Sequence, residues 1–101
     1  ILKESVLQAK CLRYLEGLGL YGRKIISANR AGTQDVVACL EGRFVGFEFK
    51  SSTGKQSELQ KWNEQEIIRN GGHYFIIREF KDFREKVSLF LENPTKKEDC
   101  F

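Results

Sequence analysis

The spacing of apolar residues predicts three helices, because apolar side chains recur every three or four positions in three segments. The first helix covers residues 2–18. The second begins at Ser57, where Gln60 completes a capping-box pattern, and ends near Asn70. The third begins where Asp82 caps it and ends before the proline near the C-terminus. The apolar faces are formed by Leu7, Cys11, Leu15 and Leu18 in the first helix and by Phe83, Val87, Phe90 and Leu91 in the last.

Shorter runs rich in branched and aromatic residues predict four strands, over residues 23–29, 35–40, 43–50 and 73–78. The resulting order is helix, three strands, helix, strand, helix. This order indicates one α/β domain over residues 1–101, with a charged tail over 95–101 that we expect to fray.

The two strands on either side of Glu41 and Gly42 predict a hairpin with a two-residue turn. In that register Leu40 pairs with Arg43, and Asp35 lies opposite Glu48. One face of the hairpin is then entirely apolar and suited to the core. It consists of Val36, Ala38, Leu40, Val45, Phe47 and Phe49.

The opposite face of the hairpin brings together Asp35, Glu48 and Lys50, because residues two apart on a strand share a face. Two carboxylates about 4 Å apart repel by roughly 4 kcal/mol in a partly screened environment. Lys50 could offset one of these charges. A divalent cation with oxygen ligands offsets both and leaves room for a water and a phosphate oxygen. The simpler alternative is a solvated ion pair between Glu48 and Lys50, worth roughly 0–1 kcal/mol.

The composition narrows the class of protein. Apolar residues make up 41% of the chain, charged residues 31%, and the net charge is +3, which is compatible with nucleic acid as a partner. Three separated cysteines and one histidine give no zinc pattern and no disulfide framework, so we expect an intracellular, cytoplasmic protein. No apolar run approaches the length that spans a membrane, so we expect no membrane association.

The ordered set of "GTQD" at 32–35, "EFK" at 48–50 and "SELQ" at 57–60, after a first helix carrying Glu4, resembles the PD-(D/E)XK nuclease superfamily. The details resemble its VRR-NUC branch in the stand-alone form found in bacteria and phages. The resemblance implies a restriction-endonuclease-like αβββαβ core, in which helices flank a central mixed sheet, followed by a C-terminal helix. It also implies a homodimeric DNA endonuclease that uses Mg²⁺ or Mn²⁺ and cuts branched DNA such as Holliday junctions.

The resemblance also implies roles for individual residues. Asp35, Glu48 and the backbone carbonyl of Phe49 would bind the metal, with Glu4 as a further ligand. Lys50 would position or activate the attacking water, and Gln60 would orient the catalytic site. The family's usual proline before the aspartate is Gln34 in this chain, which changes backbone stiffness but removes no metal ligand.

Several of these residues have a second explanation. Glu4 also suits the positive end of a helix, and Gln60 also suits a capping box without any catalytic role. Trp62 is predicted to pack in the core or in a subunit interface rather than to stack on bases, and His73 to be an ordinary surface residue rather than a general base. Five basic residues are candidates for DNA phosphate contacts, although scattered surface cations are common. These residues are Arg23, Lys24, Arg30, Lys55 and Lys61.

Two other functions remain to be weighed against an endonuclease. A non-catalytic nucleic-acid-binding module would also explain the basic residues, but it does not need two facing carboxylates. An assembly domain would use the last amphipathic helix for self-association. "STGKQS" at 52–57 lacks the spacing of a nucleotide-binding loop, which excludes that motif.

Overall fold

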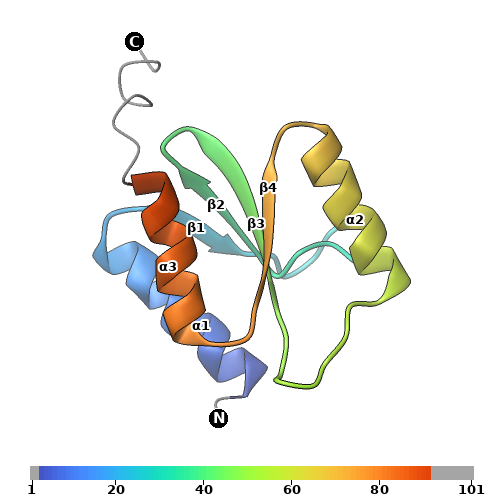
Figure 1. Ribbon diagram of the computed structural model, residues 1–101, viewed down its shortest axis with the longest axis horizontal. Helices are drawn as coiled ribbons and strands as arrows, with labels where there is room; N and C mark the ends of the chain where they lie inside the picture. The colour runs from blue at the N-terminus through green and yellow to red at the C-terminus, as the bar shows by residue number, and fades with distance from the viewer. Residues whose placement is uncertain (1–2, 92–101) are drawn as a thin grey trace.

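A four-stranded mixed sheet forms the centre of the chain, which the computed structural model describes over residues 3–91 (Figure 1). The strands lie side by side in the order β1-β2-β3-β4. The order of helices and strands along the chain agrees with the sequence prediction and with a restriction-endonuclease-like core followed by a C-terminal helix. The elements are α1 (Glu4–Gly17), β1 (Tyr21–Lys24), β2 (Val36–Leu40), β3 (Arg43–Phe49), α2 (Glu58–Arg69), β4 (His73–Ile77) and α3 (Phe80–Leu91).

The β2–β3 hairpin has the predicted register, with Leu40 paired to Arg43 and Val36 to Phe47. Glu41 and Gly42 form its turn, and both have positive φ angles, of 51° and 79°. Two successive positive φ angles are characteristic of the tight turn whose twist matches that of paired strands. The predicted apolar face of the hairpin is buried throughout.

Helices cover both faces of the sheet. α1 and α3 contact each other and the core-facing side of the strands, whereas α2 lies on the opposite face (Figure 1). In the core, the rings of Phe47 and Phe83 lie 4.7 Å apart between their centroids. β4 runs parallel to β3, so the chain must cross over between them, and α2 provides this connection.

The predicted bounds of two elements, the first strand and the last helix, are wrong. The first strand is Tyr21–Lys24 rather than 23–29. It ends early because its partner β2 begins only after Asp35. The Asp35 carbonyl accepts the last strand-like hydrogen bond, from Ile25 N–H at 2.8 Å. Ile26 has no strand to pair with and is 89% exposed despite its β propensity.

The last helix begins at Phe80, so Asp82 is not its cap. Asp82 lies in the first turn, where its carboxylate lies 3.4 Å from the ammonium of Lys86. Leu91 is more exposed than the rest of the predicted apolar face. The predicted fraying of the tail lies outside the described residues. Among the residues described, no helix is both long enough and apolar enough to cross a membrane.

Candidate functional site

Glu48 is a carboxylate in the middle of a buried strand, with 0% of its surface exposed. It points toward the α2 face of the sheet, where its Oε1 accepts a hydrogen bond from the Tyr74 hydroxyl and another, of 3.1 Å, from Gln56 Nε2. Tyr74 reaches Glu48 because β3 and β4 are parallel, with Gly46 beside Tyr74 and Glu48 beside Ile76. The glutamate is therefore held by donors from two other parts of the chain.

Gly46 makes room for this arrangement because it has no side chain. A Cβ at this position would lie 3.2 Å from the Tyr74 ring and 3.3 Å from the side chain of Gln34. Burial raises the pKa of the Tyr74 hydroxyl well above its usual range, and the hydrogen bond to Glu48 adds to this effect. Tyr74 thus stays a protonated donor toward Glu48.

The second oxygen of Glu48, Oε2, is buried and has no hydrogen-bond partner among the described residues. Lys50 Nζ lies 3.9 Å from it, too far for a hydrogen bond but close enough for charge attraction. A buried carboxylate oxygen without a partner costs free energy. This oxygen therefore has the properties of a ligand for a cation.

Asp35 lies at the same end of the hairpin. Its N–H donates to the Phe47 carbonyl at 3.0 Å, and its Oδ2 accepts from the Phe49 N–H at 2.7 Å. The strand pairs end at Val36 and Phe47, so Asp35 lies just before the ladder and bonds the main chain next to Glu48. These bonds fix Asp35 on both its backbone and its side chain.

Glu4 reaches the end of β3 from the first turn of α1. Its Oε2 accepts a hydrogen bond of 3.1 Å from the Ser51 N–H, next to Lys50. Among residues 3–91, no three His, Cys, Asp or Glu side chains are close enough together to hold a metal ion. The hydrogen bond to the Ser51 N–H thus places Glu4 near the candidate site. Its role as a metal ligand stays a prediction.

Gln60 forms the predicted capping box with Ser57. Its Oε1 accepts from the Ser57 N–H at 2.9 Å, and its own N–H donates to Ser57 Oγ at 3.1 Å. Its catalytic role stays a prediction. Gln56 is the glutamine that contacts Glu48, and its Nε2 also donates to Glu64 Oε1 at 2.9 Å.

The loop after β3 is held in place by Arg78, which sequence reasoning did not single out. Arg78 Nη1 donates to the carbonyls of Ser51 and Gly54, at 2.6 and 2.8 Å. A Cβ at Gly54 would lie 3.5 Å from Lys50 Cδ, so the loop and the Lys50 stem pack closely. Arg78 therefore supports the segment that carries Lys50.

Gln34 is 8% exposed, and its Oε1 accepts a hydrogen bond of 3.0 Å from Asn63 Nδ2. This bond ties the loop before Asp35 to α2. In place of the proline that the resemblance leads one to expect, this chain has a part-buried hydrogen bond between two side chains.

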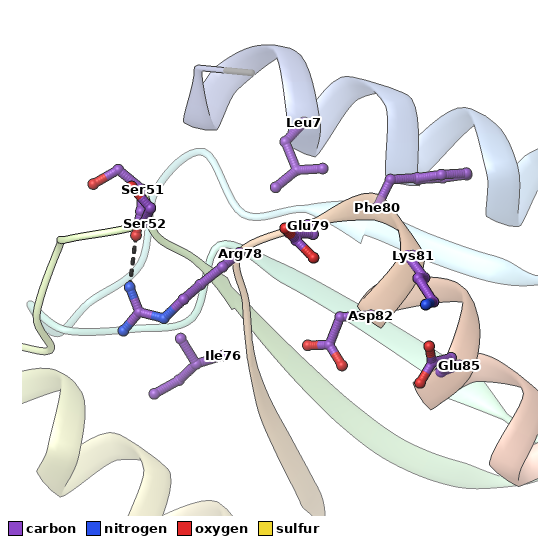
Figure 2. A pocket seen from close by; sticks show the side chains of 10 residues that line it. All are labelled: Leu7, Ser51, Ser52, Ile76, Arg78, Glu79, Phe80, Lys81, Asp82 and Glu85. Carbon is purple, nitrogen blue, oxygen red and sulfur yellow. Dashed lines mark hydrogen bonds between the residues drawn. The ribbon is translucent and has the colours of Figure 1, made fainter. Parts of the chain in front are cut away.

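A groove of about 940 Å³ lies beside the loop after β3. Figure 2 shows the Arg78 side chain extending along this groove toward Ser51 and Ser52, with Leu7 of α1 above. Asp35, Glu48 and Lys50 do not line it, and its acidic residues outnumber its basic ones. Its lining is Leu7, Ser51, Ser52, Ile76, Arg78, Glu79, Phe80, Lys81, Asp82 and Glu85.

The five predicted DNA contacts come from four segments of the chain. Arg23 lies over the ring of Tyr21, 4.2 Å from its centroid. Arg23 and Lys24 both belong to the edge strand β1. Lys55 is exposed in the loop before α2, and Lys61 pairs with a glutamate on α2. The fifth, Arg30, lies in the loop before Asp35. The exposure of these residues is compatible with phosphate contacts and does not test them.

A search of solved structures finds a structure described as "VRR_NUC domain" with a TM-score of 0.71. The match covers 93% of this chain and 99% of that chain, with 24% sequence identity. The chain has the fold of a VRR-NUC domain. No family model and no curated protein matches the chain. The resemblance first seen in short motifs therefore extends to the VRR-NUC fold over nearly the whole chain.

Proposed function

We propose that this protein is a Mg²⁺- or Mn²⁺-dependent DNA endonuclease that hydrolyses phosphodiester bonds. The observation that carries the proposal is the buried Glu48 oxygen without a partner, beside Lys50 and next to Asp35. The name of the similar structure, a VRR_NUC domain, adds support. A module that only binds nucleic acid gains nothing from a buried carboxylate oxygen that has no hydrogen-bond partner among the described residues.

The donor set suits a hard divalent cation, which prefers carboxylate and carbonyl oxygens. Glu48, Asp35 and the carbonyl of Phe49 would hold it, with Glu4 as a further ligand at the end of β3. When bound, such a cation polarises a phosphate oxygen and lowers the pKa of a coordinated water.

Side chains of the protein itself position the carboxylate, the charge and the water. Tyr74 and Gln56 fix the Glu48 carboxylate through Oε1, so Oε2 is the oxygen that remains available. Lys50 places a positive charge where negative charge develops on the phosphate, and it orients the attacking water. The capping bond occupies Gln60 Oε1 and leaves its amide Nε2 as a possible donor to the site.

The substrate that we propose is branched DNA, such as a four-way junction, cut by a homodimer. The support for this is the resemblance to stand-alone VRR-NUC domains, since two equivalent sites can nick two strands. The basic residues at Arg23, Lys24, Arg30, Lys55 and Lys61 would contact phosphates. Light scattering during gel filtration measures the dimer, and a monomer at micromolar concentration would contradict symmetric junction cleavage.

The decisive experiment is a cleavage panel of junction, flap, duplex and single-stranded DNA with Mg²⁺, Mn²⁺ or EDTA. Lys50→Ala and Glu48→Gln are expected to lose cleavage while the folded state persists, as measured by circular dichroism. Lys86→Ala serves as the matched control, because this lysine pairs with Asp82 on α3, which covers the face of the sheet opposite to Glu48. Absence of cleavage with every metal and DNA, or full activity of Lys50→Ala, would overturn the proposal in favour of a binding module.

A further inference from the structure

Trp62 is not in the core, so the first of its two predicted places is wrong, and the second, a subunit interface, stays a prediction. It lies on α2 with 51% of its surface exposed, and the guanidinium carbon of Arg30 lies 5.7 Å from the centroid of its ring. The ion pairs among the described residues involve cations other than Arg30. The arginine thus keeps its charge available while its position is set by an aromatic ring.

The loop that carries Arg30 is packed tightly against the first turn of α2. A Cβ at Gly32 would lie 2.6 Å from the backbone of Leu59, and Gly32 has a positive φ of 83°. Thr33 Oγ1 donates to the Arg30 carbonyl at 2.8 Å, which closes the loop on itself. The relative position of Arg30 and Trp62 is therefore fixed by backbone contact between the loop and the helix.

The same two elements lead directly to the candidate site. Asn63 follows Trp62, Gln34 precedes Asp35, and their side chains share the 3.0 Å hydrogen bond that links α2 to the loop. An exposed indole and a guanidinium that takes part in none of the ion pairs of residues 3–91 thus lie on the segments that position Asp35. The position suits a contact with DNA next to the scissile phosphate.

We infer that Trp62 and Arg30 form a platform for an unpaired DNA base. A base stacks on an exposed aromatic face regardless of its identity, and an arginine beside the ring adds attraction for the base or for its phosphate. Bases inside a duplex are already stacked on both faces and do not reach such a platform. The inference rests on the proposed function, and it narrows the substrate to DNA with an unpaired base at or beside the branch.

The platform can be tested without cleavage, because Trp62 is the only tryptophan in the chain. In EDTA, its fluorescence is measured while a single-stranded oligonucleotide, a flapped duplex or a blunt duplex is added. We expect the first two to quench the emission at concentrations where the blunt duplex leaves it unchanged. Equal quenching by all three, or no quenching, would overturn the inference.

Variants add a second readout, the anisotropy of a labelled flapped duplex. Trp62→Ala is expected to weaken binding about 5- to 150-fold, the range of one lost base stack, whereas Trp62→Phe retains most of the affinity. Arg30→Ala tests the platform with the fluorophore in place and weakens flap binding more than duplex binding. Ile68→Ala is the matched control, since this isoleucine is also exposed on α2, at 48%, and lies two turns away from the contact with the Arg30 loop.

The outcomes separate this inference from the proposed function. Selective quenching without cleavage of any DNA would refute the nuclease and leave the platform standing. Cleavage of branched DNA with unchanged Trp62 emission would refute the platform and leave the nuclease standing. Emission that changes with protein concentration in the absence of DNA would assign this surface to contacts between two copies of the chain and overturn the inference.

Discussion

The hydrogen bond from Tyr74 to Glu48 allows a sharp test of how the buried carboxylate is stabilised. In Tyr74→Phe the ring keeps its place in β4, where the residue is 7% exposed, and only the hydroxyl is lost. Glu48 Oε1 then retains a single donor, Gln56 Nε2 at 3.1 Å. Its other oxygen is already without a partner.

A hydrogen bond to a charged group contributes about 1.5–3 kcal/mol to the free energy of unfolding. Because Gln56 continues to donate to the same oxygen, we expect the lower part of this range, about 1.5–2 kcal/mol. For a domain of this size, that loss lowers the melting temperature by roughly 6–16 °C.

Urea unfolding followed by circular dichroism, without divalent metal, measures this loss. Tyr21→Phe is the matched control, because Tyr21 is exposed and its ring contact with Arg23 does not need the hydroxyl. The control should stay within about 0.5 kcal/mol of the unchanged protein. Equal unfolding free energies for Tyr74→Phe and Tyr21→Phe would refute the view that Tyr74 stabilises a buried charge.

Three further outcomes follow from the structure. Burial raises the pKa of Tyr74 in the folded state, so the contribution of its hydroxyl to the free energy of unfolding is complete below about pH 10 and is lost as the pH rises above it. The difference in unfolding free energy between the unchanged protein and Tyr74→Phe should therefore shrink from about pH 10 to 11. A constant difference would contradict this. Arg78→Ala removes the two carbonyl contacts of the loop after β3 and should lower the cleavage rate roughly 10- to 100-fold through misplacement of the site, with little change in DNA affinity; equal losses of rate and affinity would argue against a positioning role. In a Cys100→Ser background, exposed Cys39 should react with a thiol reagent at once. Cys11 should react only on unfolding, because its burial raises the pKa of its thiol to about 12. Equally fast labelling of both cysteines would mean that α1 is not packed as described.

The parts of the fold that were predictable from sequence depend on local chemistry. Glu41-Gly42 requires a two-residue turn, and once that turn is set, alternation along the two strands fixes which side chains are buried. Ser57 and Gln60 satisfy each other within one helical turn, so the start of α2 was equally predictable. Asp35 and Glu48 belong to this local part, which is why the candidate site could be located.

The parts that were missed depend on partners distant in the sequence. Tyr74 looks like an ordinary strand residue until the parallel pairing of β4 brings it to Glu48. Arg78 has no local signal for its contacts with the loop after β3. The exposure of Trp62 could not be read from α2 alone, since it depends on the sheet covering the other side of the helix and on where the loop with Arg30 lies.

The tight β2–β3 hairpin also has a consequence for the order in which the chain folds. Asp35 and Glu48 come together when a two-residue loop closes, whereas Tyr74 arrives only after the whole α2 crossover is complete. We therefore expect the hairpin to form before Tyr74 reaches Glu48, so that the Tyr74 contact forms late in folding. Loss of the Tyr74 hydroxyl should then speed unfolding and leave the refolding rate nearly unchanged in stopped-flow measurements. A slower refolding rate would mean that β4 docks before the hairpin is complete.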